Sequence, residues 1–143
     1  MTLPRILIAL SILLFSHLGH ATSNALSFTE PWIRLLPPTV MHTAAYVTIN
    51  NSANTPDTLL NVTSPAVNSL SVHQTKNVDG MMKMLSADDL LIPADGKTYL
   101  APGGYHIMLM GLESPLVENQ KITITFEFKH AGKIDVVFPV VKR

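Results

Sequence analysis

Strict alternation of apolar and polar residues in two segments of this chain fits extended strands and is incompatible with an amphipathic helix. It is clearest in KITITFEFK at residues 121–129, and it returns in KIDVVFPVV at residues 133–141 across the short connection HAG. A two-residue period places every second side chain on one face of an extended strand, whereas a helix needs a period of about 3.6. These segments therefore predict a hairpin with one apolar face. Pro139 suits an edge or terminal strand, because proline has no amide hydrogen.

Strand-like segments recur along the chain from residue 26 onward, with turn residues between them and no convincing helical segment. About seven short strands separated by turns are typical of a β-sandwich or a small barrel, so the sequence predicts an all-β fold. A length of 143 residues suits one domain with its own core. The other predicted strands are residues 44–49, 58–63, 69–75, 81–85 and 105–112.

The first 21 residues have the pattern of a secretory signal peptide. The charged start MTLPR is followed by the apolar run ILIALSILLFSHL and by GHA, a small-x-small cleavage pattern. About 13 apolar residues are fewer than the roughly 20 that a membrane-spanning helix needs, which argues against a retained anchor. We therefore expect residues 1–21 to be removed and residues 22–143 to form a periplasmic domain without stable membrane insertion.

Charge and cysteine content exclude several classes of function. Ten basic and ten acidic residues leave a formal net charge of zero, so nothing in the sequence indicates nucleic acid or an anionic membrane surface as a partner. The chain contains no cysteine, although an exported protein folds where disulfides form. Without thiolates, any soft-metal chemistry depends on methionine and histidine.

One pair of histidine and methionine falls on a predicted hairpin. Asp79 and Gly80 form a strong two-residue turn signal. A turn at these residues sets Thr75 opposite Met84, so that His73 and Met84 become diagonal neighbours on one face of the hairpin. A slip of one residue in register would separate them, so this pair depends on the predicted turn.

A second pair, His106 and Met108, lies two residues apart in the predicted strand 105–112 and shares one face. Together the two pairs offer two imidazole nitrogens and two thioether sulfurs. Thioether sulfur is a soft, neutral ligand that selects Cu(I), whereas magnesium and calcium prefer oxygen, and zinc sites use thiolate, imidazole or carboxylate. The predicted ion is therefore Cu(I), and the candidate ligands are His73, Met84, His106 and Met108.

The spacing of these four residues resembles the copper-binding motif of the periplasmic copper chaperone family PCuAC. Ten residues separate His73 from Met84, twenty-one separate Met84 from His106, and one separates His106 from Met108. The surrounding DGMMKM, IPADGKTYLAPGGYHIMLMGL and the early PWIR…PP…AAYVTI also resemble that family, from about residue 26 to the C-terminus.

This resemblance implies a cupredoxin-like β-sandwich in which two histidines and two methionines bind one Cu(I) ion. By that resemblance His73, Met84, His106 and Met108 are the ligands. It also implies delivery of copper toward the CuA centre of cytochrome c oxidase. The expected partners are the copper ion and a copper-accepting protein, such as cytochrome c oxidase subunit II or another copper chaperone.

Several nearby residues have other expected places. Many family members carry a methionine just after the first histidine, where this chain has Gln74 and Thr75. Met110 continues the same face deeper along its strand, so we expect it to pack in the core, and Met82 to pack around the site. His42 is expected in a loop.

Other functions fit parts of the pattern. Copper sequestration for tolerance uses the same site and differs only in whether the metal is handed on. A copper enzyme with an N-terminal histidine needs cleavage after Gly19 to expose His20, and His17 at the −3 position makes that a poor cleavage site. A blue-copper electron carrier needs a Cys thiolate. The sequence has no G-x-S-x-G, H-E-x-x-H or P-loop motif, so we expect a binding protein and not an enzyme.

Overall fold

The computed structural model describes residues 24–143, and every helix or strand assigned in that range is a β-strand. Residues 1–23, which include the predicted signal peptide, lie outside the described residues. The described range holds no helix long and apolar enough to cross a bilayer. The strands in chain order are β1 (Leu26–Arg34), β2 (His42–Asn51), β3 (Asp57–Thr63), β4 (Val67–Val78), β5 (Met81–Ser86), β6 (Leu90–Ile92), β7 (Gly96–Leu100), β8 (Tyr105–Leu112), β9 (Lys121–Phe128) and β10 (Gly132–Val141).

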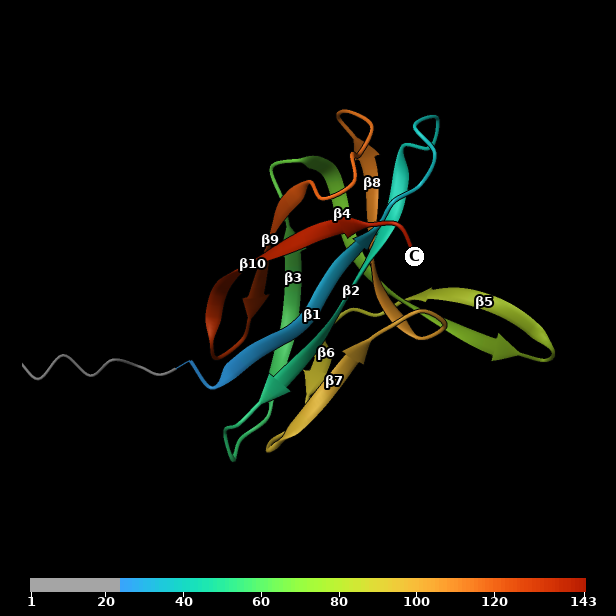
Figure 1. The fold of residues 1–143 in the computed structure, drawn as a ribbon. Coiled ribbons are helices and arrows are strands. Elements are labelled where there is room, and N and C mark those ends of the chain that lie inside the picture. The colour runs from blue at the N-terminus through green and yellow to red at the C-terminus, as the bar shows by residue number, and fades with distance from the viewer. Residues whose placement is uncertain (1–23) are drawn as a thin grey trace, which may run out of the picture.

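The strands form one continuous sheet that folds into two layers (Figure 1). One layer contains β5, β4, β8, β7, β2 and β1 in that order, and the other contains β10, β9, β3 and β6. The layers are joined where β1 runs parallel to β10, with Ile33 opposite Val140. Their apolar faces pack against each other, so the predicted all-β sandwich is confirmed.

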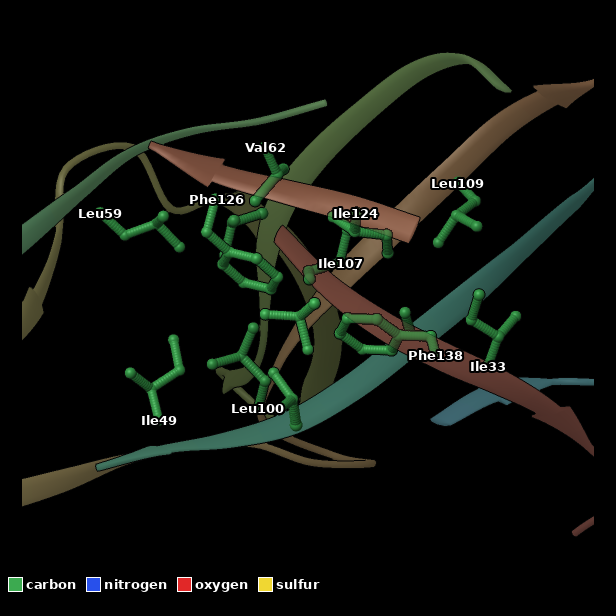
Figure 2. Close-up of a cluster of buried hydrophobic side chains, with 14 of the residues drawn as sticks. Ile33, Ile49, Leu59, Val62, Leu100, Ile107, Leu109, Ile124, Phe126 and Phe138 are labelled. Atoms are coloured by element: carbon green, nitrogen blue, oxygen red, sulfur yellow. The ribbon is translucent and has the colours of Figure 1, made fainter. Parts of the chain in front are cut away.

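Side chains from both layers meet in a hydrophobic core (Figure 2). Phe126 of β9 and Phe138 of β10 stack with their ring centroids 6.1 Å apart, and Ile107 of β8 belongs to the same buried cluster. Leu109 of β8 is also fully buried. Because Ile107 and Leu109 point into the core, the alternating residues of β8 point to the outward face of their layer. The outward face of β8 is therefore the side on which a binding site can form.

The predicted hairpin near the C-terminus is present as β9 and β10. β10 is the last strand of the chain, but it is not an edge strand, because it pairs with β9 on one side and β1 on the other. The Val140 amide donates to Gln120 O at 2.8 Å, so Val140 and Gln120 form a hydrogen-bonded pair. The next pair, Pro139 and Lys121, is then a non-hydrogen-bonded pair, in which β9 accepts no hydrogen bond from residue 139. Pairing with β1 begins only at Val140. An interior strand therefore tolerates this proline.

Three strands lie outside the segments that the sequence predicts, namely β1, β6 and β7. In β1 the pairing with β2 shifts between Thr29 and Trp32, and Glu30 there has a φ of 52°. This irregularity breaks the two-residue period. β6 has only three residues, and in β7 the polar Thr98 is buried while the aromatic Tyr99 is exposed, so alternation of polarity does not mark either strand.

A buried carboxylate holds the turn between β9 and β10. Asp57, at the start of β3, accepts hydrogen bonds from the amides of His130 at 3.0 Å, Ala131 at 2.9 Å and Thr58 at 2.7 Å. Burial raises the pKa of the Asp57 carboxyl, but these three amides and the charge of His130 together outweigh it. The pKa of Asp57 is therefore lowered from its ordinary value of 3.8.

We expect Asp57→Ala to lower the free energy of unfolding by about 1–3 kcal/mol at neutral pH, because buried amides lose their acceptor. A lowered folded-state pKa stabilises the protein fully above the ordinary value of 3.8, and that stability is lost as the pH falls through the folded-state pKa. The difference between wild type and variant should therefore shrink in acid. Chemical denaturation at a series of pH values measures it.

The matched control is Asp135→Ala, because Asp135 is exposed and its carboxylate, among residues 24–143, accepts a hydrogen bond from the Thr125 hydroxyl alone. This variant should cost little stability at any pH. If the difference in free energy of unfolding between wild type and Asp57→Ala stays constant from neutral to acid pH, the lowered pKa of Asp57 is contradicted.

Candidate metal centre

The β4–β5 hairpin has the register that the sequence predicts. Thr75 lies opposite Met84 and His73 lies opposite Ser86. The two residues of the Asp79–Gly80 turn have φ values of 52° and 82°, and two positive values are what a type I′ hairpin turn requires. His73 and Met84 are therefore diagonal neighbours on one face, as predicted.

β8 lies along the other edge of β4 and brings the second pair beside the first. His73 is the direct cross-strand partner of His106, and Ser71 is the partner of Met108. Directly opposite residues of antiparallel strands share a face. Because Ile107 points into the core, this shared face is the outward one. Four residues from three adjacent strands thus lie on one face, and we call them the His–Met cluster: His73, Met84, His106 and Met108.

The ring of His106 is buried, with 5% of the residue exposed, and one hydrogen bond orients it. Its Nδ1 lies 3.1 Å from Gly104 O, which can only accept, so we assign the proton to Nδ1. Nε2 then keeps its lone pair, which is the form that binds a metal. Gly104 O also accepts from the Thr75 amide at 3.1 Å, which ties the loop before β8 to β4.

The ring of His73 stacks beside that of His106, with centroids 6.1 Å apart and an angle of 29° between the planes. Its Nε2 lies 2.8 Å from Ser71 Oγ, while its Nδ1 is buried and has no hydrogen-bond partner among the described residues. A proton on Nδ1 would be a buried donor without an acceptor, which costs about 1–3 kcal/mol. We therefore assign the proton to Nε2. The lone pair of Nδ1 is left for a ligand, and this fits a metal ion.

The two methionines differ in how they are held. Met108 is half-buried on β8, between the small side chains of Ser71 on β4 and Ala44 on β2. Met84 is 53% exposed on β5, whose hairpin with β4 projects from the two layers (Figure 1). Within the described residues, no group of three or more His, Asp or Glu could hold a metal. Besides the two imidazoles, the donor atoms of the His–Met cluster are the two thioether sulfurs.

An aromatic pair covers the outward face beside the histidines. Trp32 of β1 and Tyr46 of β2 are cross-strand partners with ring centroids 4.5 Å apart. The register between β2 and β8, continued by one residue, sets Tyr46 level with His106. The Arg34 guanidinium lies over both rings, 5.9 Å from the Trp32 centroid and 5.4 Å from that of Tyr46. Tyr46 is thus the neighbour of His106 on this face, and Trp32 and Arg34 pack against Tyr46.

Sequence reasoning missed the residues that orient the histidines. Ser71 stands two positions before His73, and strand alternation alone could have assigned it to the same face. No sequence pattern indicated the bond from His106 to Gly104 O, because it depends on the course of the loop backbone. The pairing of Trp32 with Tyr46 is equally invisible in the sequence, because it depends on the register between β1 and β2.

Three expectations about neighbouring residues are wrong. Met110 does not pack in the core: it is 41% exposed on the outward face. His42 is not in a loop but is the first residue of β2, directly opposite Met110. Met82 is 64% exposed near the tip of the hairpin, and so is not buried around the site. The outward face of the sheet is less covered than the sequence suggested.

The sequence matches the family described as "Putative lipoprotein LpqE-like" over residues 26–140. The chain belongs to this LpqE-like family. "Putative lipoprotein Lxx21020" of Leifsonia xyli subsp. xyli (strain CTCB07) is 39% identical over 99 residues, 68% of this chain. "Uncharacterized protein RP573" of Rickettsia prowazekii (strain Madrid E) is 33% identical over 111 residues, 73% of this chain. The chain spans 60% of the length of each of these relatives.

Solved structures of PCuAC domains have the same fold as this LpqE-like chain. The "Copper-bound PCuAC domain from PmoF2" has a TM-score of 0.70 at 23% identity, with 83% of this chain and 94% of that one covered. The apo form of DR1885 from Deinococcus radiodurans has a TM-score of 0.67 at 27% identity, covering 100% and 96%. Its CuI form has a TM-score of 0.63 at 28% identity, covering 82% and 77%. The PCuAC resemblance and the cupredoxin-like β-sandwich are therefore confirmed.

The hydrogen bonds of the two rings predict opposite tautomers in the metal-free protein. We expect the proton of His106 on Nδ1 and that of His73 on Nε2, since Gly104 O and Ser71 Oγ accept from these atoms. Long-range ¹H–¹⁵N correlation spectra at alkaline pH report which ring nitrogen is protonated.

Ser71→Ala is the matched variant, because it removes the partner of His73 and leaves His106 untouched. The His73 ring should become a mixture of tautomers in this variant, and the His106 signals should keep their pattern. A wild-type His73 ring protonated on Nδ1 would rule out that nitrogen as the donor.

Proposed function

We propose that this protein is an exported copper chaperone that holds one Cu(I) ion in the His–Met cluster and passes it on by ligand exchange. The observation that carries this proposal is the register of β4 between β5 and β8. It gathers His73, Met84, His106 and Met108 on one outward face although they span more than thirty residues of sequence.

The chemistry of the donors supports Cu(I) as the ion. Two neutral thioethers and two neutral imidazoles form a soft set, and such donors select Cu(I) over hard cations. Methionine needs no deprotonation to bind and cannot be lost to a disulfide, which suits a protein exported to an oxidising compartment. The free lone pair of His73 Nδ1 and that of His106 Nε2 supply the two nitrogens.

The uneven exposure of the ligands supports handover. His106 is buried in the sheet, whereas Met84 lies on a projecting hairpin where another protein can reach it. An acceptor can therefore compete with Met84 first, while the ligands of β4 and β8 still hold the ion. The CuA centre of cytochrome c oxidase subunit II is the proposed acceptor, with another copper chaperone as the alternative.

The relatives support the same function. The fold neighbours include a PCuAC domain described as copper-bound and a DR1885 structure described as its CuI form. The family description as a lipoprotein is consistent with export, and with a periplasmic location for this chain. The signal sequence proposed for residues 1–21 and the N-terminal His20 that a copper enzyme would need both lie outside the described residues.

We expect Met84→Ala and Met108→Ala each to weaken Cu(I) binding by at least ~10-fold, since even residues that only orient a ligand contribute that much. An anaerobic titration of the domain against a chromophoric Cu(I) chelator measures the affinity. The matched control is Met81→Ala, because Met81 is 60% exposed on the same hairpin but points to its other face.

Wild-type affinity in all three variants would contradict the proposed site. A loss in Met81→Ala equal to that in Met84→Ala would mean that the hairpin binds copper without the predicted orientation. Circular dichroism and thermal unfolding of each variant separate loss of ligand from loss of fold.

Delivery and sequestration predict different results with an acceptor. We expect the Cu(I)-loaded protein, mixed anaerobically with the soluble CuA domain of subunit II, to lose copper to that domain. Separation of the two proteins and measurement of copper in each fraction detect the transfer. A Cu(I) chelator dialysed against the loaded protein alone controls for spontaneous release, and copper retained in the presence of the acceptor would favour sequestration.

A further inference from the structure

We propose a second, weaker Cu(I) site formed by His42 of β2 and Met110 of β8. It lies on the same outward face as the His–Met cluster and shares no ligand with it. This inference deepens the proposed function and rests on it, because it assumes that the protein meets Cu(I).

The two residues are direct cross-strand partners. The Gly111 amide donates to Met41 O at 3.1 Å, and a bond between these flanking residues makes His42 and Met110 a non-hydrogen-bonded pair. In such pairs the Cα atoms are only about 4.5 Å apart and the side chains approach most closely. One imidazole and one thioether therefore start from adjacent backbone positions on the same face.

Both side chains are open to solvent. Met110 is 41% exposed and His42 is exposed at the start of its strand, so neither is needed to fill the core. On the other edge of β8, Ser69 lies opposite Met110, and its small side chain leaves the sulfur accessible. Neither residue belongs to the buried hydrophobic core, and an imidazole beside a thioether is a donor pair suited to a soft ion such as Cu(I).

The second pair lies next to the first site along β8. His106, Met108 and Met110 follow one another at alternate positions of one strand, about 7 Å apart per step. Met108 stands between the small residues Ala44 and Ser71, so no large side chain of the paired strands separates the two sites. With two donors in place of four, the second site should bind more weakly and fill after the first.

The stoichiometry of Cu(I) binding tests this inference. In an anaerobic titration of the domain, we expect two equivalents for the wild type, one tight and one weaker. His42→Ala and Met110→Ala should each remove the weaker equivalent and leave the tight one unchanged. The matched controls are Met81→Ala and His130→Ala, which remove an exposed methionine and an exposed histidine elsewhere and should retain both equivalents.

Spectra locate the second ion independently of affinity. The methyl signal of Met110 and the ring signals of His42 should shift only on addition of the second Cu(I) equivalent. A single equivalent in the wild type would overturn the inference, as would a second equivalent that survives both substitutions. If Met84→Ala loses only the tight equivalent, the second site is supported as independent of the first. If the wild type shows no tight binding but a weak equivalent that His42→Ala removes, the proposed function is refuted and the second site is not.

Discussion

β4 is hydrogen-bonded to β5 along one edge and to β8 along the other, and these two ladders fix where the proposed ligands lie. His73 stands where these two ladders meet, opposite Ser86 on β5 and opposite His106 on β8. A slip of one residue between β4 and β5 would turn Met84 to the opposite face, and a slip between β4 and β8 would do the same to His106 and Met108. The proposed metal site therefore depends first on the registers of β4 with β5 and with β8.

The hydrophobic core holds those registers. Ile107 and Leu109 of β8 and Val72 of β4 are buried, so their neighbours in sequence must face outward. Stability and ligand placement thus come from the same alternation, and a substitution that shifts the core would also move the donors. Met84 is the exception, because all six residues of β5 are exposed and only the ladder with β4 positions it.

Hydrogen bonds from outside the ligand set orient both histidine rings, and for His106 the acceptor lies in the loop before β8. Gly104 O accepts both from His106 Nδ1 and from the Thr75 amide of β4, so one carbonyl orients a ring and joins two strands. Ser71, which lies on β4 itself, orients the His73 ring through a hydrogen bond to Nε2. Hydrogen bonds to Gly104 and Ser71, which are not among the proposed ligands, therefore select which nitrogen of each ring keeps its lone pair.

The sequence was enough to predict the strand period, the turn at Asp79–Gly80 and hence the pairing of His73 with Met84, because these depend on neighbours close along the chain. The other contacts of the proposed site depend on how distant strands pair in the folded protein. The pairing of His42 with Met110 joins strands almost seventy residues apart, and no local pattern specifies such a contact. Whether an outward side chain is covered also depends on distant strands: Tyr46 of β2 is level with the buried His106, while Met110 on the same strand face stays open to solvent.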